Sequence, residues 1–124
     1  MGVVGVGWIG GISSDTSHLT YCKLFNVMDK CEALRAAYSP DLFVTKQTPP
    51  TFIYHTFDDD TVPVEQVLRF YDAMVKAGVP TEMHIFAHGP HGSGLGMGNP
   101  QLSVWPELLI KWMREHGYAA RSRE

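Results

Sequence analysis

The amino-acid sequence predicts an α/β fold, a three-stranded parallel sheet with flanking helices. Apolar runs at residues 3–9 and 51–56 and an alternating polar and apolar stretch at residues 81–87 have strand character, and helical patterns separate them along the chain. Strands that alternate with helices form parallel sheets, because right-handed crossovers place the helices on the faces of the sheet. The 124 residues suffice for one domain and are too few for two.

The first predicted strand contains glycines at positions 5, 7 and 10, which match the dinucleotide-binding pattern G-x-G-x-x-G. In a nucleotide-binding fold these glycines follow a strand and open a helix, whereas here they lie inside the apolar run. We therefore interpret them as strand glycines and predict no cofactor. A helix is predicted over residues 29–37, before Pro40, and residues 41–47 form a connector.

The second predicted strand, residues 51–56, is apolar enough to be covered on both faces. Residues 64–77 have the pattern of an amphipathic helix, which Gly78 ends by adopting the left-handed conformation. The apolar residues expected on one side of this helix are Val67, Tyr71, Met74 and Val75.

The third predicted strand alternates polar and apolar residues, and a glycine-rich loop over residues 88–100 follows it. The last helix is predicted over residues 104–116, with Ser103 as its N-cap and Gly117 after its end. Its expected buried stripe consists of Leu108, Leu109, Trp112 and Met113.

Composition excludes several classes of protein. The net charge of −3 gives no reason to expect binding to nucleic acid or to an anionic membrane, and no apolar run has the length of a membrane span. Cys22 and Cys31 form no disulfide framework, so reduced thiols are expected. No basic residue precedes the first apolar run and no A-x-A site follows it, which favours a strand over a signal peptide and predicts a cytoplasmic protein.

Polar residues follow the last two predicted strands. Asp58, Asp59 and Asp60 come after the second strand, and His88 and His91 come after the third. Because neighbouring parallel strands end at the same edge of a sheet, an aspartate can reach a histidine there. A carboxylate that orients an imidazole, which accepts a proton from a nucleophile, is the arrangement of a hydrolytic triad. The alternative is a solvated turn whose charges balance the start of the next helix.

Two further alternatives stay open. His84, His88 and His91 have the spacing H-x3-H-x2-H, and imidazoles beside carboxylates suit zinc or iron. The open edge of the first strand also fits a non-catalytic module that pairs with another chain. That partner would be a second copy, in a homodimer, or a separate N-terminal half.

The segment HTFDDDTVPVE at residues 55–65 and the loop GPHGSGL at residues 89–95 resemble the C-terminal portion of the α/β-hydrolase superfamily. The pair WP at residues 105–106 and the segment YSPDL at residues 38–42 extend the resemblance, which is greatest to the acetyl-esterase, lipase and xylan-esterase-like carboxylesterases. The resemblance implies that Asp59 is the triad acid and His91 the triad base of a hydrolase acting on a small ester.

The sequence departs from this family because it contains no G-x-S-x-G motif for the nucleophile. The nearest segment, around Ser13, has Asp15 in place of the last glycine, and we interpret Ser13 and the loop residue Ser93 as turn serines. The expected domain is a single partial α/β-hydrolase domain over residues 1–117, followed by a flexible tail over residues 118–124. Without a nucleophile and an oxyanion hole we expect the isolated chain to be nearly inactive.

Overall fold

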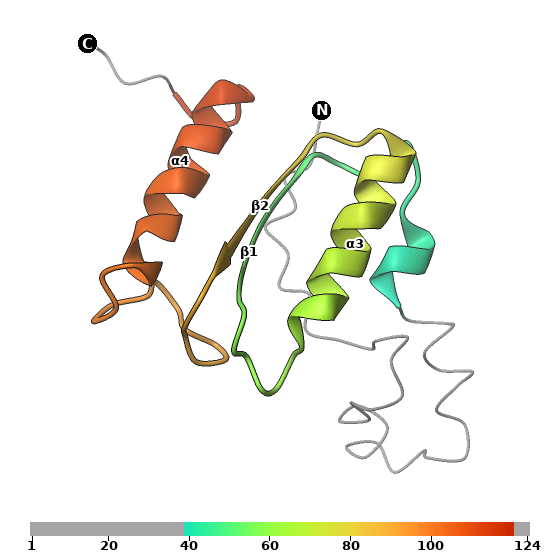
Figure 1. Cartoon of the computed structure of the whole chain (residues 1–124). Coiled ribbons are helices and arrows are strands. Elements are labelled where there is room, and N and C mark those ends of the chain that lie inside the picture. Colours follow the sequence, from blue (N-terminus) through green and yellow to red (C-terminus); the bar gives the residue numbers. More distant parts are fainter. Residues whose placement is uncertain (1–38, 121–124) are drawn as a thin grey trace, which may run out of the picture.

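The computed structural model of the chain describes residues 39–120, in which two parallel strands lie between two helices (Figure 1). The elements in chain order are the 3-10 turn η2 (Pro40–Phe43), strand β1 (Thr51–Thr56), helix α3 (Val64–Ala77), strand β2 (Thr81–Phe86), the 3-10 turn η3 (Leu102–Val104) and helix α4 (Trp105–Glu115). The α/β class and its helical layers are therefore as predicted.

The predicted three-stranded sheet is confirmed in its last two strands only. Among the described residues the sheet has two strands, β1 and β2, which pair in parallel. The predicted strand at residues 3–9 and the predicted helix at residues 29–37 lie outside the described part of the chain. Within the predicted connector at residues 41–47, η2 adds a short helical turn that the sequence pattern did not indicate.

Strands β1 and β2 pair over their whole length, from Thr51 opposite Thr81 to Thr56 opposite Phe86. Both strands consequently end at the same edge of the sheet, where the loops that follow them lie side by side. Phe52 and Ile53, which point to opposite faces, are only 2% and 3% exposed. This confirms the prediction that β1 is covered on both faces.

The buried stripe of helix α3 differs from the predicted one, since it also includes Val64 and Gln66. Val67 and Met74 are buried, as expected for residues two turns apart on one face. Val75 is 56% exposed, contrary to the prediction, because one residue beyond Met74 it is rotated about 100° away from the buried line. Gly78 ends the helix at φ 71°, and its amide donates back to the last turn, as predicted.

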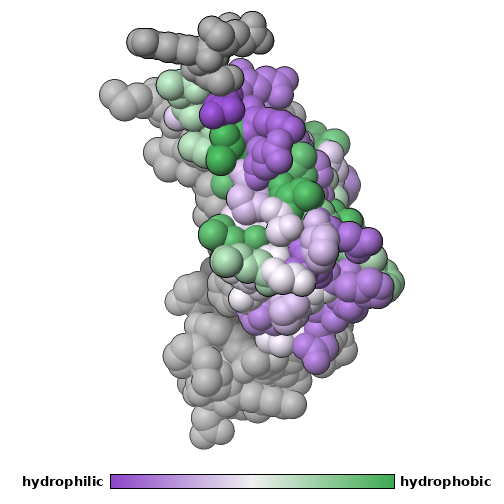
Figure 2. Space-filling view, turned by 90° about the vertical axis from the view of Figure 1, so that its left-hand side faces the viewer, coloured by the Kyte–Doolittle hydropathy of each residue, from purple (hydrophilic) through white to green (hydrophobic). Residues whose placement is uncertain are grey.

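Helix α4 packs on the other side of the sheet through a mainly aromatic core of Phe52, Leu102, Trp105 and Trp112. Ser103 was wrongly predicted to cap this helix, since its hydroxyl donates to the Pro100 carbonyl instead. The Asn99 side chain accepts hydrogen bonds from the two amides that open η3, at 3.1 Å each. Over the outer surface of α4, hydrophilic residues lie beside hydrophobic ones (Figure 2).

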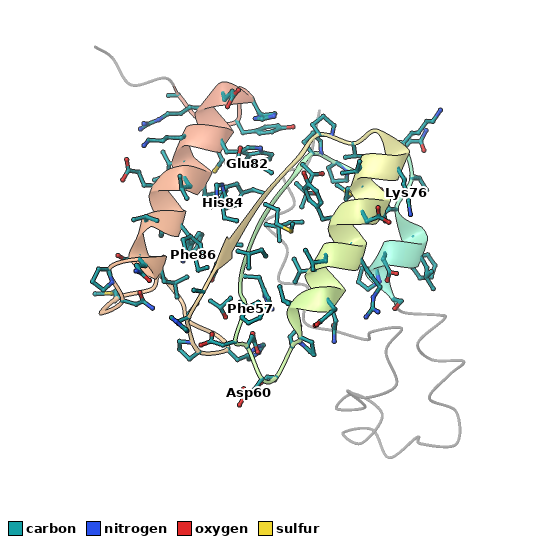
Figure 3. The ribbon with its side chains drawn as sticks, in the orientation of Figure 1. Phe57, Asp60, Lys76, Glu82, His84 and Phe86 are labelled. Atoms are coloured by element: carbon teal, nitrogen blue, oxygen red, sulfur yellow. The ribbon has the colours of Figure 1, made fainter. Side chains whose placement is uncertain are left out.

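The polar face of β2 lies toward α4 instead of facing solvent (Figure 3). His84 packs against the ring of Phe52, with ring centroids 5.4 Å apart, and its Nε2 donates to Glu82 at 2.7 Å. Ile85, on the apolar side of the alternation, is 38% exposed. Alternation therefore identified the strand correctly without identifying its buried face.

None of the helices within residues 39–120 is long and apolar enough to span a bilayer.

Gly96 lies where the loop after β2 approaches the backbone of η3. It adopts φ 70°, and a Cβ there would lie 2.8 Å from the Ser103 amide nitrogen. Gly98 has φ 86° but open space around it. We expect Gly98→Ala to lower the free energy of unfolding by about 1 kcal/mol through backbone strain. Gly96→Ala should cost about 1–3 kcal/mol more, because backbone must shift. Urea unfolding measures both, and equal losses would contradict the close approach.

Candidate active site

The three consecutive aspartates after β1 have three different partners. Asp59 turns back on its own loop, where Oδ1 accepts the Thr61 amide at 2.9 Å and the Val62 amide at 2.8 Å. These two hydrogen bonds form a local turn that orients the Asp59 carboxylate independently of the second loop. Asp59 is also the least accessible of the three, with its side chain only 5% exposed.

The other oxygen of Asp59 contacts His91, from the loop after β2. The distance from Asp59 Oδ2 to His91 Nδ1 is 2.9 Å, and the His91 side chain is 26% exposed. An ionised carboxylate can only accept, so Nδ1 carries the proton and donates it. The structure therefore brings together the two residues that the sequence singled out, in the geometry by which an acid orients a catalytic imidazole.

Asp59 is ionised in this environment. Burial by itself raises the pKa of Asp59, but hydrogen bonds from the Val62 amide, His91 and the Thr61 amide together outweigh it. The pKa of Asp59 therefore lies below its ordinary value. A carboxylate that stays charged can stabilise positive charge on an imidazole that it contacts.

His55 is a site residue that the sequence analysis missed. It lies near the end of β1, where its Nε2 donates to the Val62 carbonyl at 2.8 Å and lies 3.8 Å from Asp59 Oδ2. Its side chain is 13% exposed. His55 thus holds the far end of the Asp59 turn. Its position four residues before the acid was visible in the sequence, but nothing there indicated the contact.

Asp58 and Asp60 differ from Asp59 in what they bind. Asp58 Oδ2 accepts His88 Nδ1 at 2.9 Å, and the hydrogen bond from His88, with that from the Gly89 amide, lowers the pKa of Asp58. Asp60 accepts the Thr61 hydroxyl at 3.3 Å and lies at the outer tip of the turn (Figure 3).

Aromatic residues hold the loop that carries His91. The Gly94 carbonyl accepts both the Tyr54 hydroxyl, at 3.2 Å, and Trp105 Nε1, at 3.0 Å. The Tyr54 and Trp105 rings stack with centroids 4.1 Å apart. Gly92 and Gly94 have positive φ of 70° and 55°, a conformation that side chains disfavour. The glycine-rich loop is therefore shaped and anchored, as expected for one that presents an imidazole.

A cavity of about 240 Å³ lies beside this pair and includes Asp59 and His91 in its lining. Residues 52–56 of β1 all contribute to the lining, and they alternate between the two faces of the sheet. A cavity bordered by consecutive residues of one strand opens along the edge of that strand. Within residues 39–120, β1 has β2 as its neighbour on one side only.

The three histidines proposed as metal ligands do not converge. His84 pairs with Glu82, His88 with Asp58 and His91 with Asp59. The described residues contain no group of three or more histidine, cysteine or acidic side chains that is placed to bind a metal ion. Ser13 lies outside the described residues, and Ser93 contributes to the lining of the cavity.

The low pKa of Asp59 predicts a pH-dependent contribution to stability. The carboxylate binds fewer protons when folded than when unfolded, so its contribution is complete above its ordinary pKa of 3.8. It is lost as the pH falls through the lower pKa of the folded state. At neutral pH, Asp59→Asn should lower the free energy of unfolding by about 2 kcal/mol.

Urea unfolding of both proteins over descending pH provides the measurement. The difference between wild type and Asp59→Asn should shrink in acid, whereas Asp60→Asn serves as the matched neighbour and should have little effect at any pH. A difference that grew as the pH fell would contradict the predicted sign.

Two substitutions at His55 separate its hydrogen bond from its volume. His55→Phe leaves the Val62 carbonyl without its donor, and should cost about 1–3 kcal/mol of unfolding free energy. His55→Gln can place an amide donor near the former Nε2 and should retain much of that stability. Thermal or urea unfolding compares them. If both variants lost the same stability, the hydrogen bond would not be the cause.

Residues 9–118 match the prolyl oligopeptidase family. A solved acetyl ester-xyloside bifunctional hydrolase from Caldicellulosiruptor lactoaceticus is 43% identical, with a TM-score of 0.69 over 71% of this chain. A carboxylesterase from Lactobacillus plantarum is 27% identical, with a TM-score of 0.70 over 91% of this chain. A non-reducing polyketide synthase from Penicillium brasilianum is 37% identical over 60 residues, which are 48% of this chain.

These relatives are longer than this chain. The matched part spans 32% of the bifunctional hydrolase, 42% of the carboxylesterase and 2% of the polyketide synthase. The family match covers most of the sequence, including both loops of the site. The chain therefore belongs to the prolyl oligopeptidase family and shares the α/β-hydrolase fold that its turn and loop motifs predicted.

Proposed function

We propose that Asp59 and His91 are the acid and the general base of a serine-dependent carboxylic ester hydrolase. The observation that supports this assignment is the 2.9 Å contact between Asp59 Oδ2 and His91 Nδ1, made by an acid whose side chain is 5% exposed and whose pKa is lowered. Both residues also line the cavity, where a substrate would have to approach the imidazole.

The proposed reaction is acyl transfer through a serine. His91 takes the serine proton at Nε2 as the hydroxyl attacks the ester carbonyl, and then gives that proton to the leaving alcohol. Asp59 holds the ring through Nδ1 and stabilises the transient positive charge. Water then attacks the acyl-enzyme carbonyl with His91 again as base, which releases the acid and regenerates the serine.

We assign the nucleophile to polypeptide outside these 124 residues. No G-x-S-x-G motif occurs in these 124 residues, and the matched hydrolases are more than twice as long as the part that aligns. The outer edge of β1 is the place where further strands of the sheet would pair, since the cavity opens along it beside Asp59 and His91. In this proposal the chain supplies the acid and base to a complete hydrolase.

An ester is the proposed substrate even though the family is named for peptidases. The matched hydrolases of known structure are described as an acetyl ester-xyloside hydrolase and a carboxylesterase. Paired p-nitrophenyl ester and p-nitroanilide substrates distinguish the two reactions, because the first reports ester cleavage and the second amide cleavage.

The isolated 124-residue chain should hydrolyse p-nitrophenyl acetate barely above the blank, because it contains no G-x-S-x-G motif, whose backbone amide would also contribute to an oxyanion hole. Ser13→Ala and its neighbour Ser14→Ala should leave this low rate unchanged. Robust turnover that Ser13→Ala abolished would overturn the assignment of the nucleophile to another polypeptide.

In an extended protein that supplies a G-x-S-x-G segment, His91→Ala should lower kcat by about a thousandfold or more. Asp59→Ala should lower it strongly as well, with KM little changed. His84→Ala is the matched control, because this histidine pairs with Glu82 and does not line the cavity. Activity that survived His91→Ala would reject the proposed base.

The competing proposal, a non-catalytic module that self-associates, is tested by light scattering during size-exclusion chromatography. A stable homodimer that excluded an N-terminal half would favour self-association through the β1 edge. A monomer that gains esterase activity on adding the N-terminal half favours the hydrolase.

A further inference from the structure

A second carboxylate–imidazole pair joins the same two loops as Asp59 and His91. His88 Nδ1 donates to Asp58 Oδ2 at 2.9 Å, and the Gly89 amide donates to Asp58 Oδ1 at 3.0 Å. Both oxygens of Asp58 therefore bind consecutive residues of the histidine loop. The side chains are exposed, 77% for His88 and 45% for Asp58, so the pair adds little to stability and acts mainly through its geometry.

The backbone of Gly89 makes hydrogen bonds through both its amide and its carbonyl. Its amide donates to Asp58, and its carbonyl accepts the Thr56 hydroxyl at 2.9 Å. A Cβ at this position would lie 2.7 Å from Thr56 Cγ2 and 2.8 Å from Leu102 Cδ2. The end of β1, the aspartate turn and the start of η3 thus enclose this glycine closely.

Pro90 links the position of Gly89 to that of His91. The pyrrolidine ring fixes the φ angle of Pro90, and the residue before a proline has a restricted range of its own. Few free torsions therefore separate the fixed Gly89 peptide from the backbone of His91. A shift of residues 88–89 would move His91 relative to Asp59.

We propose that Asp58 and His88 are positioning residues, which fix Gly89 and thereby place His91 Nδ1 against Asp59. This inference rests on the proposed function of His91 as the general base. Two similar pairs on the same two loops then have different tasks, since the buried pair performs proton transfer and the exposed pair sets the alignment of the loops.

Asp60 provides an internal control for this assignment. It is the next carboxylate along the chain after Asp59 and shares the same turn, but its described contact is with the adjacent Thr61 hydroxyl. Removing its charge changes the local electrostatics while leaving the contacts between the two loops in place.

The test is an NMR measurement on the full 124-residue chain, labelled with 15N at neutral pH. The low-field signal of the His91 Nδ1 proton reports its hydrogen bond to Asp59, and His91→Ala identifies that signal. His88→Ala should shift this signal upfield or lose it to exchange with water. His88→Asn places an amide donor near the former Nδ1 and should restore it, and Asp60→Asn should leave it unchanged.

A His91 signal that keeps its wild-type position and intensity in His88→Ala would overturn the proposal, as would failure of His88→Asn to restore it. If His88→Ala does not fold, Asp58→Ala is decisive in the same measurement, because it removes the acceptor of both His88 and the Gly89 amide. An unchanged His91 signal in Asp58→Ala would also overturn it. This measurement needs no turnover, so failure of the positioning role and failure of the proposed esterase reaction remain distinguishable.

Discussion

The parallel pairing of β1 with β2 is the constraint on which the rest of the described structure depends. The register sets Thr56 opposite Phe86, so both strands end together and release their loops at one edge. Two short polar segments about thirty residues apart in the sequence thereby become neighbours. A slip by one residue would turn the side chains of a strand to the opposite face and move the aspartates of one loop away from the histidines of the other.

The interactions between the two loops differ in how exposed they are to solvent. The Thr56 hydroxyl binds the Gly89 carbonyl, Asp58 binds the exposed His88, and the nearly inaccessible Asp59 binds His91. Burial strengthens a charged hydrogen bond and makes an unpaired charge costly, which is why the innermost carboxylate has the most donors. The stacked rings of Tyr54 and Trp105 hold the other end of the histidine loop.

Much of this part of the fold could be predicted from the sequence. The limits of β1 and of α3 followed from local pattern and from proline and glycine positions, which act through the backbone itself, and those of the loop after β2 were predicted to within one residue. Predictions that required a side chain's surroundings were less successful. Ser103 has the chemistry of an N-cap, but its hydroxyl donates to the Pro100 carbonyl instead. Val75 is apolar, but it lies off the line that faces the sheet.

The sequence by itself determined that three aspartates and two histidines lie at the same edge of a parallel sheet, because strand ends and helix starts follow from local pattern. The choice of Asp59 and His91 among them came from the resemblance to carboxylesterases. Only the tertiary structure decided how three adjacent aspartates divide their partners and which histidine each one binds. It also brought His55 onto the acid turn and opened the cavity along β1. Local pattern specifies where a backbone turns, whereas the partner of a polar side chain depends on distances set by the packing of distant segments.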